Sequence, residues 1–281
     1  MRVLFFSTYE IVKQSGGVES VTRFLYEYLN SNGYSVYLMY WQNHKGLKSE
    51  LCQVGLPDKC NMNSLCNIDF IKSYLIKNEI DVVINQTAVN SRTSAGCTIA
   101  CNELKIPLVS VLHNTPDLFL RENKFFKIFF YTSFTRLLIY RMWYYFQSVF
   151  RGFKGGKFIF DNSSCVVLLS KKYFNDYCYI NTNSNFDKIE VINNPAILQI
   201  PVLPSDKENV VVFVGRLEPQ KSVDKLLDIW YIIESKYKDL GWKLYILGDG
   251  SCRRYLENLS KNMRLRNVRF VGMVDPNEYY K

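Results

Sequence analysis

One apolar run that ends in a glycine and a cation constrains this chain more than any other stretch. Residues Val210–Val214 are all apolar and mostly β-branched, and Gly215, Arg216 and Leu217 follow directly. Such a run predicts a strand of an α/β sheet that is buried on both faces, and the glycine allows the backbone to turn tightly near a ligand. Ligands of open α/β sheets bind beyond the carboxyl ends of the strands, so we expect a functional site here.

Two cations follow this strand at a spacing that suits phosphate. Arg216 comes directly after the glycine, and Lys221 lies five residues further on. An arginine forks onto two phosphate oxygens and a lysine adds a point charge, so the pair favours a diphosphate site. In the alternative interpretation both are solvated loop charges and Ser222 caps the next helix. The pattern strand-Gly-Arg is too short to decide between the two.

A second glycine-containing loop follows the first predicted strand, near the N-terminus. Gly16, Gly17 and Glu19 stand between that strand and a helix predicted over residues 18–32, where apolar residues recur at helical spacing. The order strand, glycine loop and helix is the arrangement that binds anions with backbone N–H groups and the helix dipole. A glycine pair alone is more often an ordinary turn.

Three motifs in the second half of the chain occur in a recognisable order. Val214-Gly215-Arg216-Leu217 with Lys221 is followed by Gly248-Asp249-Gly250 after an apolar strand, and then by the run Val268–Gly272. Together they resemble the second domain of the retaining GT-B glycosyltransferases, specifically glycosyltransferase family 4. The resemblance implies that Arg216 and Lys221 hold the diphosphate of a nucleotide sugar and act in catalysis. It also implies donor or nucleotide contacts for Gly215, Gly248 and Gly250.

The first half of the chain extends this resemblance. Gly16, Gly17 and Glu19 match the G-G-x-E/A/R loop of family 4, which implies that the glycines face the donor and Glu19 faces the acceptor. His113 ends a buried strand predicted over residues 106–114, in the sequence S-x-x-H-N. A lone histidine is more often structural, but the resemblance implies a catalytic, acceptor-side residue that hydrogen-bonds or polarises a sugar.

Length and resemblance together predict the architecture. A chain of 281 residues suggests two domains. The resemblance implies a GT-B-like α/β fold with two Rossmann-like domains facing a cleft: an acceptor-side domain over residues 1–200 and a partial nucleotide-sugar-binding domain over residues 201–281. Family members continue with an E-x7-E segment that these residues do not contain. We therefore expect a second sheet of three strands with an uncovered edge, and low stability or a need for a partner.

Charge and cysteine content limit the partners and the location. Lys and Arg outnumber Asp and Glu by 35 to 26, which favours anionic partners, and the chain shows no nucleic-acid-binding motif. Between Glu122 and Asp161 there are basic and aromatic residues but no acidic ones, which fits contact with an anionic membrane or a helix pair packed on the sheet. The resemblance to family 4 favours membrane contact. The eight cysteines form no C-x-x-C motif, so we expect no zinc site. The apolar run at the N-terminus is too short for a signal peptide, so we expect a cytoplasmic location, at the inner membrane face.

The resemblance implies transfer of a hexosyl or N-acetylhexosaminyl group, with retention, from a nucleotide-diphosphate sugar to a saccharide or lipid-linked acceptor in cell-surface polysaccharide biosynthesis. It implies no metal and no cofactor, in agreement with the absence of a D-x-D motif. Two other functions remain open: a non-catalytic remnant that binds nucleotide at the membrane surface, and a GT-B nucleotide-sugar epimerase. Product analysis without an acceptor separates the epimerase from the transferase.

Overall fold

The computed structural model describes residues 1–12, 16–43, 49–87, 91–116, 155–180, 186–195, 208–237 and 241–274. The chain divides into two compact units, Met1–Ile197 and Leu198–Lys281, and each is considered by itself. The boundary expected near residue 200 falls within residues 196–207, outside the described part. The domain roles assigned from the sequence therefore stay predictions.

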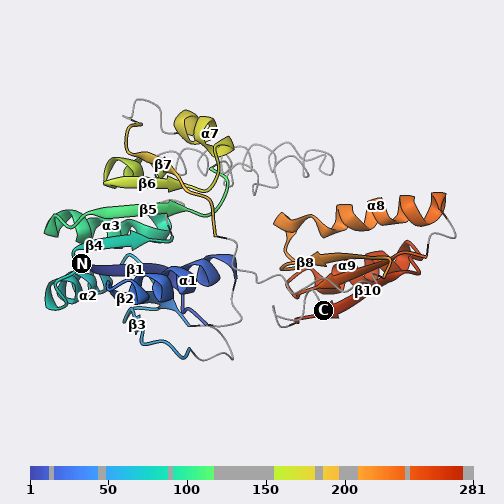
Figure 1. Cartoon of the computed structure of the whole chain (residues 1–281), viewed down its shortest axis with the longest axis horizontal. Helices are drawn as coiled ribbons and strands as arrows, with labels where there is room; N and C mark the ends of the chain where they lie inside the picture. Colours follow the sequence, from blue (N-terminus) through green and yellow to red (C-terminus); the bar gives the residue numbers. More distant parts are fainter. Residues whose placement is uncertain are drawn as a thin grey trace, which may run out of the picture. The chain divides into compact units, whose positions relative to one another are not determined.

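The first unit is built on a parallel sheet of seven strands (Figure 1). The order across the sheet is β3-β2-β1-β4-β5-β6-β7, so its direction of growth reverses between β1 and β4. In open α/β sheets this reversal marks the place where ligands bind. The strands are β1 (Arg2–Tyr9), β2 (Ser35–Gln42), β3 (Val54–Gly55), β4 (Val82–Asn85), β5 (Leu108–Leu112), β6 (Cys165–Leu168) and β7 (Ile189–Val191).

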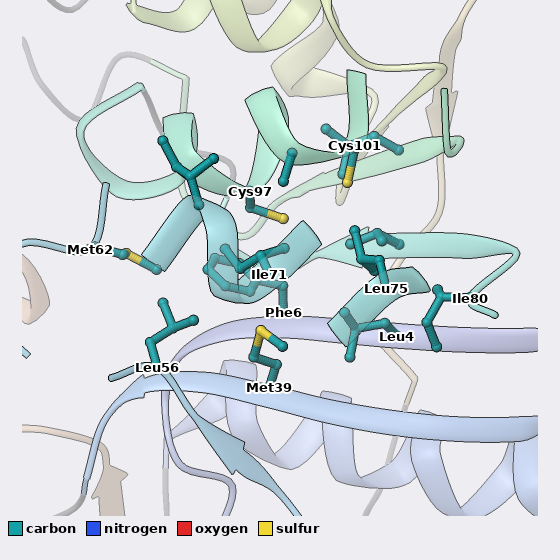
Figure 2. Close-up of a cluster of buried hydrophobic side chains, with 14 residues drawn as sticks. Leu4, Phe6, Met39, Leu56, Met62, Ile71, Leu75, Ile80, Cys97 and Cys101 are labelled. Atoms are coloured by element: carbon teal, nitrogen blue, oxygen red, sulfur yellow. The ribbon is translucent and has the colours of Figure 1, made fainter. Parts of the chain in front are cut away.

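Helices pack on both faces of this sheet. Side chains alternate along β1, so Leu4 and Phe6 join the core cluster of the helices α2 and α3, whereas Val3 and Phe5 face the cluster of α1. Figure 2 shows the first cluster, in which Phe6 lies close to Ile71 of α2. The helices are α1 (Gly17–Ser31), α2 (Leu65–Lys77), α3 (Ser91–Leu104) and α7 (Lys172–Ile180), and residues 155–161 are also helical.

The second unit repeats the strand-helix pattern on a smaller scale. Its three parallel strands lie in the order β10-β9-β8. Its elements are β8 (Val210–Val214), the short 3-10 helix η1 (Pro219–Lys221), α8 (Val223–Lys236), β9 (Lys243–Leu247), α9 (Arg253–Asn262) and β10 (Val268–Gly272). The predicted α/β class with parallel sheets is confirmed, and so is the three-stranded second sheet, in which β8 pairs with β9 alone among the described strands.

The prediction that the strand Val210–Val214 is buried on both faces is wrong. Val212 and Val214 are 45% and 41% exposed, and Val211 is 39% exposed. The physical reason is that α8 and α9 both pack on the face that carries Leu244 and Ile246. Val212 and Val214 pair in register with Tyr245 and Leu247, and therefore lie on the opposite face. This reason does not apply to Val211, which pairs with Leu244 on the face that the helices cover.

The basic, aromatic segment that favoured membrane contact lies almost wholly in residues 117–154, outside the described residues. Lys157, in the helical residues 155–161, forms an ion pair with Asp161 at 3.3 Å. None of the helices in the described ranges is long and apolar enough to cross a membrane. Membrane contact stays a prediction.

We predict that the first core cluster stabilises the sheet strongly through α2. Leu75→Ala removes a side chain that is 0% exposed and should lower the free energy of unfolding by about 2–5 kcal/mol. Its neighbour Ile76 is 62% exposed, so Ile76→Ala should change the free energy by no more than about 0.5 kcal/mol. Urea unfolding followed by circular dichroism measures both variants. Equal losses would contradict this packing.

Candidate functional site

The carboxyl edge of the second sheet carries two loops that are hydrogen-bonded to each other. We call residues 215–222, after β8, the cation loop, and residues 248–252, after β9, the G-D-G loop. The N–H of Leu217 donates to the carbonyl of Asp249 at 2.9 Å, and the N–H of Cys252 donates to the carbonyl of Leu217 at 2.9 Å. Leu217 is fully buried, and both its N–H and its carbonyl group are hydrogen-bonded to the G-D-G loop. These two bonds fix the position of the cation loop.

Glycine is required at both ends of the G-D-G motif because backbone atoms come very close. Gly248 has φ of +126°, and a Cβ there would lie 2.1 Å from the carbonyl oxygen of Gly215. A Cβ on Gly250 would lie 2.6 Å from the carbonyl oxygen of Leu217. Real Cβ atoms do not approach backbone this closely, so these glycines serve the packing of the two loops. Their predicted contact with a nucleoside stays a prediction.

A carboxylate that sequence reasoning missed also joins the two loops. Glu218 accepts hydrogen bonds from the N–H of Ser251 at 3.0 Å and from its hydroxyl at 2.7 Å. These bonds, with a further contribution from the charge of Arg216, lower the pKa of Glu218. The only signal in the sequence was an acidic residue after Arg-Leu and a serine after Gly-Asp-Gly, which neither propensity nor periodicity singles out.

The two predicted diphosphate ligands are exposed cations without a described ion pair, which is also true of Arg254 and Arg266 in the same unit. Arg216 and Lys221 are both exposed, and within the described part of the chain no ion pair involves either of them. Arg253, by contrast, forms ion pairs with Asp249 at 3.1 Å and with Glu257 at 2.9 Å. The charges of Arg216 and Lys221 are therefore not neutralised by a described carboxylate in direct contact.

The N-terminus of α8 follows Lys221 directly and carries no side-chain cap. Ser222 stands at its N-cap position with φ of 50°, in the left-handed region, and its hydroxyl makes no capping hydrogen bond. The alternative prediction that Ser222 caps this helix is therefore wrong, because the left-handed backbone turns the residue away from capping geometry. The positive end of the α8 dipole thus lies beside the cation loop.

In the first unit, Gly16, Gly17 and Glu19 lie at the N-terminus of α1. Gly16 is the N-cap residue and no side chain caps the helix. A Cβ on Gly16 would lie 2.9 Å from Oε2 of Glu19, so this carboxylate folds back against the start of its own helix. A carboxylate is stabilised there by the helix dipole. Any anion bound at the two glycines must share this position with Glu19.

His113 follows β5 directly, at the carboxyl edge of the first sheet. Its Nε2 is hydrogen-bonded to Oε1 of Gln86, which follows β4 in the same way. Burial lowers the pKa of His113 from 6.5 to about 4, so the imidazole is neutral at pH 7. A neutral imidazole offers one donor and one acceptor, which suits hydrogen bonding to a hydroxyl group.

The pair Asn85 and Gln86 was not assigned any chemistry from the sequence. Both side chains are buried at the reversal of strand order, where the N–H of Gln86 donates to the carbonyl of Phe6 in β1 at 2.9 Å. The available signal was two consecutive amides directly after the apolar residues Val82, Val83 and Ile84. The two amides could not be assigned to the site from the sequence alone, because only the strand order shows that β4 lies next to β1.

The structure thus gathers the predicted residues into two groups, one in each unit. Gly215, Arg216, Lys221, Gly248 and Gly250 lie on one edge of the second sheet. The other group (Gly16, Gly17, Glu19 and His113) lies in the first unit, after β1 and β5. Among the residues that the structure describes, no group of three or more His, Cys, Asp or Glu side chains could hold a metal ion.

We predict that Gly250→Ala forces the two loops of the second unit apart. The new methyl group overlaps the backbone of Leu217, which should destabilise the protein by about 1–3 kcal/mol. Gly17→Ala is the matched control, since a Cβ there meets no atom within 4 Å. Differential scanning calorimetry compares the two variants. A Gly250→Ala protein as stable as the control would contradict the observed contact between the loops.

The lowered pKa of His113 predicts a pH dependence of stability. Because the folded pKa is about 4 and the unfolded pKa about 6.5, the unfolded chain binds more protons between these values. The stabilisation is fully present above pH 6.5 and is lost as the pH falls towards 4, with a total on the order of 3 kcal/mol. NMR titration of the ring protons measures the pKa, and His44→Gln assigns the two histidines. A pKa near 6.5 for His113 would contradict its burial.

Comparison with known proteins places a family match on the second unit. Residues 208–281 match the family model described as glycosyl transferases group 1. An uncharacterized glycosyltransferase of Haemophilus influenzae is 29% identical over 93 residues, which are 33% of this chain and 26% of that protein. The amylovoran biosynthesis glycosyltransferase AmsD of Erwinia amylovora is 38% identical over 79 residues, 27% of this chain and 21% of that protein. The matches thus span about a quarter or less of each curated relative.

Solved structures match over nearly the whole chain. The lipopolysaccharide outer core galactosyltransferase WaaB in its apo form has a TM-score of 0.59 at 16% identity, covering 98% of this chain and 68% of that chain. Anabaena HepE, in complex with UDP and glucose, has a TM-score of 0.62 at 15% identity, covering 97% and 69%. At such low identity these similarities show the fold. The chain has the α/β fold of GT-B glycosyltransferases, as the sequence predicted.

Proposed function

We propose that this chain transfers a sugar, with retention at the anomeric carbon, from a nucleotide-diphosphate sugar to a saccharide acceptor. One observation carries the proposal. Arg216 and Lys221 are exposed at the carboxyl edge of the second sheet, beside an uncapped helix N-terminus, in the segment that matches the group 1 glycosyl transferases. Neither cation takes part in an ion pair among the described residues of the unit, so both side chains are available to an external anion.

The chemistry of the proposed reaction makes use of these cations. When the bond between the sugar and the diphosphate breaks, negative charge develops on the leaving diphosphate. Arg216, Lys221 and the N–H groups at the start of α8 stabilise that charge, and they need no rearrangement because the G-D-G loop already fixes the cation loop. Removal of one such donor typically lowers kcat by about 10²–10³-fold. In this proposal no metal ion takes part.

The first unit supplies the acceptor side in this proposal. His113 is neutral at pH 7 and contacts a sugar hydroxyl. In this proposal Glu19 serves the acceptor side, and Gly16 and Gly17 serve the donor. The acceptor in this proposal is a saccharide, which in one form of the proposal is linked to a lipid. The pathway is the assembly of cell-surface polysaccharide, and the reaction takes place in the cytoplasm at the membrane. The names of the AmsD and WaaB relatives support the pathway. The excess of basic residues supports contact with anionic lipid.

A non-catalytic role as a nucleotide-binding scaffold is the second candidate. It is favoured by the face of the second sheet that α8 and α9 leave open, where Val212 and Val214 are each more than 40% exposed. Exposed apolar surface of this kind is typical of sites that another polypeptide covers. A scaffold and an enzyme share the diphosphate site and differ in turnover.

Calorimetric titration of the 281-residue chain with UDP and GDP tests the diphosphate site. We expect saturable binding of one of them, and Arg216→Ala should weaken it by about 10–100-fold, because a charge-assisted hydrogen bond contributes about 1.5–3 kcal/mol. Arg266→Ala is the matched control. It removes the same charge before β10, at the opposite edge of the same sheet, and should leave the affinity unchanged.

Two results would contradict the proposed site. One is equal affinity of the wild type and the Arg216→Ala protein. The other is no binding of either nucleotide by a wild-type chain that circular dichroism shows to be folded. Saturable binding without transfer of sugar from UDP-glucose, UDP-galactose or GDP-mannose to any saccharide acceptor tried would favour the scaffold.

A further inference from the structure

Two buried amides follow β4, and their hydrogen bonding is incomplete. Asn85 and Gln86 are 0% and 4% exposed. Buried polar groups are nearly always paired, yet Nδ2 of Asn85 and Nε2 of Gln86 have no partner among the residues that the structure describes. A buried polar group lowers the stability of the fold unless a hydrogen-bonding partner, such as a ligand, satisfies it. The two unpaired amide nitrogens at this edge of the sheet therefore require an explanation.

The backbone around Gln86 is fixed from both sides. Oδ1 of Asn85 accepts hydrogen bonds from the N–H of Thr87 at 2.9 Å and from its hydroxyl at 2.8 Å. A backbone N–H only donates, so the amide oxygen of Asn85 must face it, and Nδ2 must be the unpaired atom. This turn encloses Gln86, whose own N–H is bonded to the carbonyl of Phe6. The side chain of Gln86 therefore starts from a fixed point.

That side chain reaches the imidazole of His113, and the orientation of its amide decides where the ring proton lies. In the structure Oε1 of Gln86 contacts Nε2 of His113. An amide oxygen accepts hydrogen bonds and cannot donate them, so in this orientation of the amide Nε2 carries the proton. A neutral imidazole has a single N–H, and Nδ1 is then a bare acceptor. The unpaired NH2 group of Gln86 adds a donor in the same neighbourhood.

We propose that Gln86 is a positioning residue that holds His113 as the tautomer protonated on Nε2, so that Nδ1 accepts a hydrogen bond from a hydroxyl group of the substrate. That the hydroxyl belongs to a sugar rests on the proposed function, whereas the tautomer does not. The hydroxyl donates to Nδ1, on the opposite side of the ring from Gln86, so the NH2 group of Gln86 needs a separate acceptor. Through this contact the amide of Gln86, which follows β4, holds the side chain of His113, which follows β5.

The test is direct observation of the tautomer in the full chain. With histidine labelled by 15N, long-range 1H–15N correlation at pH 7 shows which ring nitrogen carries the proton, and His44→Gln assigns the two rings. We expect His113 to be neutral with Nε2 protonated and Nδ1 bare, by at least about tenfold over the other tautomer, because the other tautomer leaves the amide oxygen unpaired.

Two variants of Gln86 test the cause. Gln86→Met keeps the length of the side chain without hydrogen-bonding atoms, so the preference for one tautomer should fall by about tenfold or more. In Gln86→Glu the carboxylate also accepts from Nε2, so the proton should stay on Nε2 as in the wild type. Gln53→Met is the matched control. It removes the two 2.9 Å hydrogen bonds to the backbone of Ile11 in the same unit and should leave the tautomer unchanged.

Three outcomes would overturn the proposal: a wild-type His113 protonated on Nδ1, a tautomer unaffected by Gln86→Met, or the same change in Gln53→Met as in Gln86→Met. A donor role of the Gln86 amide would appear as the first outcome, with Gln86→Glu moving the proton to Nε2. Titration with UDP remains a separate readout on the second unit. If UDP does not bind but His113 is protonated on Nε2 as expected, the sugar is removed from the proposal. The role of Gln86 in positioning His113 then stands by itself.

Discussion

Parallel strand pairing is the constraint on which the rest of the structure depends. Every described strand pair in both sheets is parallel. Parallel neighbours require a crossover between them, and all carboxyl ends then meet at one edge. The loops after β1, β4 and β5 therefore share an edge in the first unit, as do the loops after β8 and β9 in the second. The polar and charged candidate residues lie on these loops.

Backbone contacts, rather than side chains, fix the candidate diphosphate site. The cation loop is bonded to the G-D-G loop through Leu217, and two glycines allow the approach. The Glu218 carboxylate adds bonds to Ser251. Because the loops are fixed in this way, Arg216 needs no intramolecular ion pair to define the position of its backbone. The groups that fix the loops are thus different from the charged groups that face an anion. Electrostatic stabilisation of a leaving group requires charged groups that are already in place before the reaction.

The two units differ in how completely their sheets are covered. In the first, helices pack on both faces, and alternate residues of β1 are buried on either side. In the second, α8 and α9 share one face, so the alternation of β8 leaves Val212 and Val214 exposed. The sequence of β8 is as apolar as that of a doubly covered strand. An apolar strand sequence is compatible with burial on both faces. Whether helices cover both faces depends on the side of the sheet on which the crossover helices lie.

The sequence by itself determined the α/β class, the order of the elements and most candidate residues. These follow from local periodicity, from glycines where the backbone needs them, and from ordered motifs. His113 was found because it ends an apolar strand in the sequence S-x-x-H-N, which resembles family 4. Tertiary structure alone decided that Gln86 contacts His113 and that Glu218 binds Ser251. Each of these depends on strand order or on loop geometry, which bring together groups that no local pattern relates.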